Sequence, residues 1–162
     1  MRTGVFIDTQ LWVYSKKKPI KERYENGERF EKALETHNES YSFLKQLKGQ
    51  NLRIYLTTHQ VAELYHSLSF RGYRVDLKET LQFIDSLYQN NRFEVVVVDN
   101  SHLTEALRLS KKSLVNVWDY LCVLPLKGAI SVAYTNDKHF QHPTFQNLGF
   151  EIKNPLSNWE VL

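Results

Sequence analysis

Four acidic residues are spaced so that a folded chain could gather their carboxylates into one site. They are Asp8, Glu63, Asp119 and Asp137. Asp8 directly follows the apolar stretch 5–7, and Asp137 follows the stretch 132–135. In a parallel α/β sheet the carboxyl ends of neighbouring strands meet at one edge, where ligands bind. Because hard divalent cations prefer oxygen ligands, we predict that the four side chains form a carboxylate cage for a divalent metal.

Each aspartate also has an ordinary structural explanation. Asp8 and Asp137 have the positions of a helix N-cap or a turn residue. Asn116 followed by Asp119 resembles a capping box, and a carboxylate there also complements the helix dipole. The two roles are compatible, since a carboxylate in a first helical turn can still face the sheet edge. Asp99, which precedes another predicted helix, is explained by capping and is left out of the site.

Glu63 lies on the polar side of a predicted helix, opposite an apolar stripe. The stripe consists of Val61, Leu64, Tyr65 and Leu68. His59 and His66 share the side of Glu63, and their spacing fits either a zinc-binding face or a solvated polar face. No ligand spacing is found for the other histidines, His37, His102, His139 and His142. The single cysteine, Cys122, is predicted to be a buried, reduced thiol, and alone it excludes an intrachain disulfide and a cysteine-based zinc knuckle.

A basic cluster early in the chain is the candidate surface for binding a polyanion. It consists of Lys16, Lys17, Lys18, Lys21 and Arg23. These side chains could hold a phosphate backbone without reading its sequence, or they could form a solvated face. The net charge of +3 is compatible with a nucleic-acid partner and does not require one.

Short strands alternate with helices along the whole chain. Strands are predicted at 4–8, 52–56, 93–98, 130–135 and 150–152. Helices are predicted at 9–14, from Phe30 to Gly49, from Thr58 to near Gly72, from Asp76 through Leu87, and at 101–112 and 117–127. The β-branched run at 93–98 favours a strand that is buried on both faces. The tail after Asn154 is expected to be irregular and anchored by Trp159.

This alternation implies parallel strands joined by right-handed crossovers, and therefore a three-layer α/β/α fold. At 162 residues the chain is long enough for one well-buried core, so a single domain spanning 1–162 is expected. No apolar run approaches the roughly 20 residues that cross a bilayer. The start, Met1-Arg2-Thr3, leads into a strand and not into a signal sequence, so a cytoplasmic protein with no membrane partner is predicted.

The order of the acidic elements resembles the PIN-domain nucleases, and the resemblance spans nearly the whole chain. The matching segments are Val5-Phe6-Ile7-Asp8-Thr9, Thr58-His59-Gln60-Val61-Ala62-Glu63, Trp118-Asp119-Tyr120 and Thr135-Asn136-Asp137-Lys138-His139-Phe140. The resemblance implies a central, mostly parallel sheet of four or five strands. It also implies a Mg²⁺- or Mn²⁺-dependent ribonuclease that acts on RNA and is often a homodimer. The length is near that of the small prokaryotic members, many of which are VapC-like toxins paired with a small antitoxin protein.

Carried over by position, the catalytic and metal-binding residues would be Asp8, Glu63, Asp119 and Asp137. We expect the three aspartates to hold one metal ion and Glu63 to orient or deprotonate the attacking water.

The chain departs from the family pattern in three places. Gln10 stands where a small polar residue is frequent, and the helix of Asp119 is bulky and should kink or end early at Pro125. The charged segment 16–39 is enlarged and is a candidate determinant of substrate or partner. Two alternatives therefore stay open: a catalytically silent PIN-like binding or scaffold module, and a structure-specific DNA nuclease.

Overall fold

A computed structural model describes residues 3–162, and these residues contain a sheet of five parallel strands. The strands are β1 (Thr3–Ile7), β2 (Leu52–Thr57), β3 (Phe93–Val96), β4 (Val132–Tyr134) and β5 (Glu151–Lys153). They are arranged in the order β3-β2-β1-β4-β5, which puts β1 at the centre. The predicted α/β class and the parallel sheet are confirmed. Met1 and Arg2, where the sequence was expected to lead into β1, lie outside the described residues.

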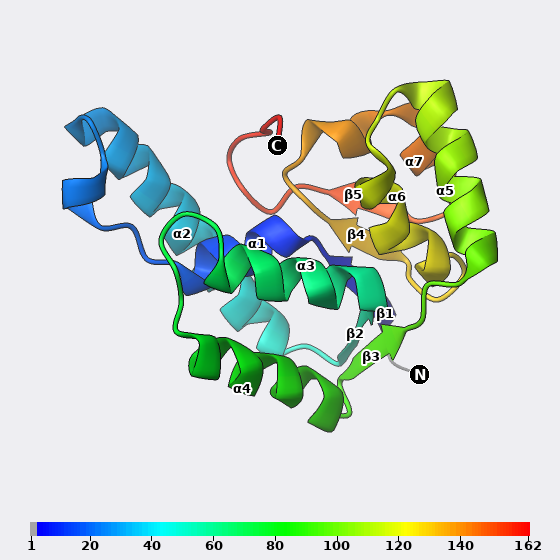
Figure 1. Ribbon diagram of the computed structural model, residues 1–162, viewed down its shortest axis with the longest axis horizontal. Helices are drawn as coiled ribbons and strands as arrows, with labels where there is room; N and C mark the ends of the chain where they lie inside the picture. The colour runs from blue at the N-terminus through cyan, green and yellow to red at the C-terminus, as the bar shows by residue number, and fades with distance from the viewer. Residues whose placement is uncertain (1–2) are drawn as a thin grey trace.

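Helices pack on both faces of this sheet (Figure 1). They are α1 (Thr9–Lys16), α2 (Gly27–Lys48), α3 (Thr58–Ser69), α4 (Leu77–Gln89), α5 (Asn100–Ser113), α6 (Val117–Val123) and α7 (Pro143–Gln146). Successive side chains of a strand point to opposite faces. Val5 and Ile7 of β1 therefore join the core under α1 to α4, whereas Phe6 joins the core under α5 to α7. None of the helices within residues 3–162 has the length and apolar character that crossing a membrane requires.

Strand β3 differs from the prediction of a strand buried on both faces. It ends at Val96, its residues are only half-buried, and Val97 beyond it is 67% exposed. The reason is its place in the sheet, because among the described strands its one neighbour is β2. A run of valines satisfies an edge strand and a central strand equally well, so the sequence alone could not distinguish them.

The helix termini follow the capping residues of the sequence. Thr57, Asp76 and Asp99 each accept hydrogen bonds from the first turn of the following helix. Asn26 does the same for α2, which therefore begins at Gly27 and not at Phe30 as predicted. The helix predicted at 117–127 stops at Val123, because Pro125 belongs to a short 3₁₀ turn, as its missing N–H requires.

The C-terminal segment lies beside the end of β4. The backbone N–H of Glu160 donates to Asn136 O at 2.7 Å, and Lys138 N donates to Glu160 O at 2.7 Å. Leu156 packs against the core beneath α1 to α4. The tail is thus anchored as expected, and Glu160 and Leu156 contribute to this anchoring. Ser157 also donates hydrogen bonds to Glu39. Trp159 is half-buried, and its role as an anchor stays a prediction.

Candidate functional site

The fold places the four predicted acidic residues around the carboxyl edge of the sheet. Asp8 follows β1, and Asp137 follows β4, the neighbour of β1. Glu63 lies in the second turn of α3, which starts directly after β2 on the other side of β1. Asp119 lies in the first turn of α6, which packs against α3 and β2. Segments that are far apart in the sequence therefore converge here because their strands are adjacent.

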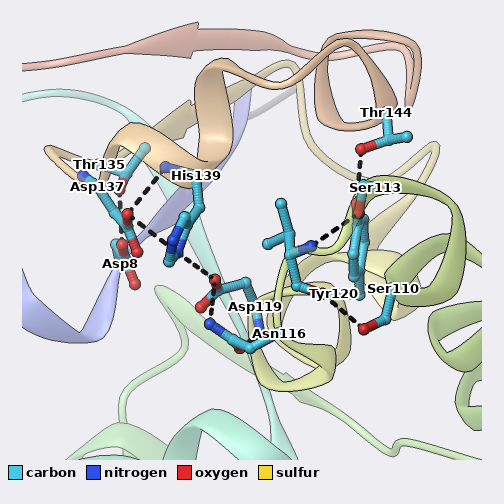
Figure 2. A network of polar contacts seen from close by, with 11 residues as sticks. Asp8, Ser110, Ser113, Asn116, Asp119, Tyr120, Thr135, Asp137, His139 and Thr144 are labelled. Carbon is cyan, nitrogen blue, oxygen red and sulfur yellow. Dashed lines mark hydrogen bonds and ion pairs between the residues drawn. The ribbon is translucent and has the colours of Figure 1, made fainter. Parts of the chain in front are cut away.

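Thr135 connects two of the carboxylates. Its hydroxyl donates to Asp8 Oδ2 at 2.6 Å and accepts from the backbone N–H of Asp137 at 3.0 Å. Asp137 Oδ1 in turn accepts from the backbone N–H of His139 at 2.9 Å. Figure 2 shows Asp8, Thr135 and Asp137 side by side. Asp8 and Asp137 are 7% and 4% exposed, so their positions are fixed by burial as well as by these bonds.

The other two acidic residues are also held by specific contacts. Glu63 Oε2 accepts from the hydroxyl of Thr9 at 2.6 Å and from the thiol of Cys122 at 3.6 Å. Asn116 caps α6 by accepting from the backbone N–H of Asp119, and its amide donates to Asp119 Oδ2 at 2.8 Å. The predicted capping by Asn116 is confirmed, and it leaves the carboxylate of Asp119 facing the site.

The carboxylates share one electrostatic environment. Burial, reinforced by the negative charges of Glu63, Asp119 and Asp137, raises the pKa of Asp8 to about 8. Burial and the charges of Asp137 and Glu63 raise the pKa of Asp119 to about 7. The pKa of Asp137 is also raised, chiefly by burial. Negative charges of neighbouring carboxylates thus disfavour ionisation of all three aspartates, as expected for acids gathered without a cation.

His139 is a site residue to which the sequence analysis assigned no role. Its Nδ1 lies 3.1 Å from Asp119 Oδ2 and 3.4 Å from Asp137 Oδ1, and Figure 2 shows the ring between the two carboxylates. Donor atoms of these three side chains lie within 4.8 Å of one another. The sequence did contain one indication of this role, because His139 follows Asp137 by two residues and its ring lies on the same turn.

A second polar network fixes the helix that carries Asp119. The hydroxyl of Tyr120 lies 2.6 Å from the hydroxyls of both Ser113 and Thr144, so α6 is tied to α5 and α7 (Figure 2). Ser110 donates to the carbonyl of Val115 at 2.6 Å and fixes the turn before α6. Because these hydrogen bonds fix α6 against α5 and α7, they also fix the position of Asp119.

The predicted basic cluster is divided by the structure. Lys16 lies over the ring of Phe83 at 4.3 Å, at an apolar cavity of about 640 Å³ between α1, α2 and α4. Lys17 points elsewhere, and its Nζ donates to the carbonyls of Ser67 and Arg71 at the end of α3. Lys16 is thus separated from the rest of the predicted cluster and lies beside Lys48 instead. Lys17 fixes the chain between α1 and α2.

Three residues of the predicted cluster, Lys17, Lys18 and Arg23, line one groove of about 760 Å³ beside α1, together with three further cations. Its basic residues are Lys17, Lys18, Arg23, Arg29, Lys32 and Arg71. Lys21, also predicted, is exposed in the turn Lys21–Arg23 and does not line the groove. Arg23 stacks over the ring of Tyr73, 5.0 Å from its centroid.

Tyr14 and Glu160 also line the groove, on the side of the acidic cluster. The hydroxyl of Tyr14 donates to Glu160 Oε2 at 2.9 Å. Burial, with the charges of Glu160 and Asp8, raises the pKa of Tyr14. Glu160 also pairs with Asp137 in an isolated bridge. One end of the groove therefore lies near the carboxylates, although none of the four lines it.

Comparisons with known proteins bear on the fold. No protein-family model and no curated protein matches the sequence. The structure is similar to a chain in the crystal structure of VapBC2 from Rickettsia felis bound to a DNA fragment from their promoter, with a TM-score of 0.56. The fold is PIN-like. The similarity covers 94% of this chain and 98% of that chain at 16% sequence identity, so the common feature is the fold.

Proposed function

We propose that the protein is a metal-dependent ribonuclease that hydrolyses RNA phosphodiester bonds. The observation that carries the proposal is the convergence of Asp8, Glu63, Asp119 and Asp137 on one edge of the sheet, where burial and neighbouring negative charges raise the pKa of the aspartates. The fold similarity to a chain of a VapBC2 complex supports a role as the toxin of a toxin–antitoxin pair, with a small antitoxin as partner. A homodimer and a cytoplasmic location stay predictions.

The donor set fits a hard divalent cation, Mg²⁺ or Mn²⁺, because the converging ligands are carboxylate oxygens. Asp8, Asp119 and Asp137 would hold the ion, and the imidazole of His139 would extend this donor set beside Asp119 and Asp137. When bound, the cation neutralises charge at the scissile phosphate and makes a nearby water more acidic.

Glu63 would orient or deprotonate the attacking water. The hydroxyl of Thr9 donates to its Oε2 at 2.6 Å and so fixes the carboxylate plane, and the side chain is only partly buried. Asp8 is buried more deeply than Glu63 and accepts a hydrogen bond from the hydroxyl of Thr135. Its carboxylate is therefore held in a fixed position, which suits a metal ligand.

Cleavage of a labelled RNA is the direct test of this function. We expect cleavage with Mn²⁺ or Mg²⁺, loss of cleavage with a chelator, and recovery when Mn²⁺ is restored. Calorimetry should detect Mn²⁺ binding in the absence of RNA. Cleavage that persists in chelator would contradict the metal role, and Mn²⁺ binding without cleavage of any RNA would favour the silent binding module.

The groove beside the acidic cluster is the proposed track for the RNA backbone. Six cations supply sequence-independent attraction for phosphates. Tyr24 and Tyr73 also line the groove, and aromatic rings of this kind stack on bases in single strands. The enlarged segment 16–39 contributes most of this surface, which supports the expectation that it determines the substrate.

Replacing Arg23 and Arg71 together by Ala should weaken RNA binding and leave the metal site intact. Each lost phosphate contact should reduce the slope of log K against log salt by about 1. The measurement is RNA affinity by anisotropy across a salt series, with calorimetry to verify Mn²⁺ binding. A matched control is Lys111→Ala with Lys112→Ala, which removes two exposed cations from α5, outside the groove. Equal loss of affinity in both double variants would show that net charge, and not the groove, governs binding.

A further inference from the structure

A second group of potential metal ligands lies beside the carboxylates and differs from them in chemistry. His59 and Glu63 are one turn apart on α3, and Cys122 lies on α6, which packs against α3. One donor atom from each side chain lies within 4.8 Å of the other two. Residues four apart on a helix are neighbours on its surface, so α3 supplies two donors and α6 closes the group.

The imidazole of His59 is held in place but incompletely satisfied. Its ring stacks on Trp118 with centroids 5.4 Å apart and an interplanar angle of 9°. Its Nε2 is buried and finds no hydrogen-bond partner among residues 3–162. Burial also lowers the pKa of His59, which favours the neutral ring whose lone pair can bind a metal. A buried nitrogen without a hydrogen-bond partner lowers the stability of the fold. A metal ion bound through Nε2 would supply the missing partner.

The thiol of Cys122 is directed toward the same centre. Its Sγ lies 3.6 Å from Glu63 Oε2, and the residue is 3% exposed. Metal binding would release the thiol proton to solvent, as thiolate ligation requires.

We propose that His59, Glu63 and Cys122 form a second metal site that selects Zn²⁺ or a similar borderline cation. One nitrogen, one oxygen and one sulfur suit zinc, which takes three protein ligands and an open fourth position in many sites. The all-oxygen cluster suits Mg²⁺ or Mn²⁺ instead. The sequence pattern had suggested His66 as the third ligand, but His66 stacks on Phe70 and Cys122 takes that place.

Glu63 belongs to both groups of ligands. Its charge contributes to the raised pKa of Asp8 and of Asp119, so it lies near these carboxylates as well as near the thiol. A zinc ion on His59 and Cys122 would therefore engage the carboxylate to which we assign the attacking water. This consequence, inhibition of RNA cleavage by Zn²⁺, rests on the proposed function, whereas the site itself does not.

Co²⁺ is a suitable probe because a thiolate ligand gives it a charge-transfer absorption band. The full chain, with excess Mg²⁺ to occupy the carboxylates, would be titrated with Co²⁺ and then with Zn²⁺. We expect one equivalent of Co²⁺ to produce the band, with release of a proton, and Zn²⁺ to abolish the band. Because Cys122 is the single cysteine, the band can arise from no other residue.

Two variants make the assignment specific. Cys122→Ser should lose the band, and His59→Gln should weaken Co²⁺ binding by at least about 10-fold. His66→Gln is the matched control, since His66 is on the same helix and stacks in parallel on Phe70, without a thiol neighbour. The absence of a thiolate band in the unmodified chain would overturn the proposal. So would equal affinity in the His59→Gln and His66→Gln proteins, both of which can be verified as folded by circular dichroism. No RNA is needed, so failure here is distinguishable from failure of the proposed nuclease activity.

Discussion

Replacing Asp8 by Asn, alone or together with Asp137→Asn, should lower metal-dependent RNA cleavage by about 10²–10⁴-fold. Both aspartates are buried and almost isosteric with asparagine, and each accepts a hydrogen bond that an amide oxygen can also accept. The substitution therefore removes charge and a metal ligand while keeping the shape. The measurement is the single-turnover rate with Mn²⁺ at saturating metal, together with the calorimetric affinity for Mn²⁺.

Asp99→Asn is the matched control for this experiment. Asp99 also follows a strand, but its carboxylate is exposed and is used to cap α5 through Ser101 and His102. Asparagine is an equally good cap, so activity and stability should both stay near those of the unmodified chain. Full activity in the Asp8→Asn/Asp137→Asn protein would show that the reaction does not depend on the proposed carboxylate site.

The sheet could be predicted from the sequence because its strands are bounded by strong local signals. Short apolar stretches are followed by capping residues such as Thr57 and Asp99, and each cap starts a helix. Parallel pairing then follows from the intervening helices. The position of β3 at the edge could not be predicted, because strand order is decided by how whole βα units pack and not by the composition of one strand.

The site was predictable to the extent that it depends on strand ends. Asp8 and Asp137 follow adjacent parallel strands, so topology alone brings them together. His139 and Glu160 were missed because their places depend on a turn and on the path of the tail. The basic cluster was resolved only in part, since the turn between α1 and α2 directs Lys16 and Lys17 toward different neighbours. The catalytic and substrate-binding roles of all these residues stay predictions.

The stability of the metal-free chain should fall as the pH rises from about 4 to about 8. The carboxyl of Asp8 has a pKa of about 8 in the folded chain and 3.8 as its ordinary value, so in this window the folded state binds more protons than the unfolded state. Stability falls with pH wherever the folded state holds the extra proton. Asp119, with a pKa of about 7, acts in the same direction. Together the two carboxyls should lower the free energy of unfolding at neutral pH by on the order of a few kcal/mol.

The destabilisation caused by Asp8 can be measured by comparing the unmodified chain with Asp8→Asn. In chelator, the variant should be more stable at pH 7.5 by roughly 5–10 °C in Tm, and the difference should shrink toward pH 4.5. Mn²⁺ binds ionised carboxylates, so it should raise the Tm of the unmodified chain more at pH 7.5 than at pH 5 and should have little effect on Asp8→Asn. A difference in Tm that stays constant with pH would mean that Asp8 is not held as a neutral acid.

One substitution, Asp8→Asn, should therefore strongly reduce activity and, in chelator at neutral pH, stabilise the fold. A loss of activity accompanied by lower stability at every pH would indicate a packing defect and not a missing metal ligand. Asp8→Asn is expected to separate these two outcomes because Thr135 can still donate to the amide oxygen, so the cavity around Asp8 keeps its hydrogen bond. If Asp8 is a metal ligand, Asp8→Asn should be more stable than the unmodified chain in chelator and should bind Mn²⁺ more weakly. An aspartate with a purely structural role would show neither result.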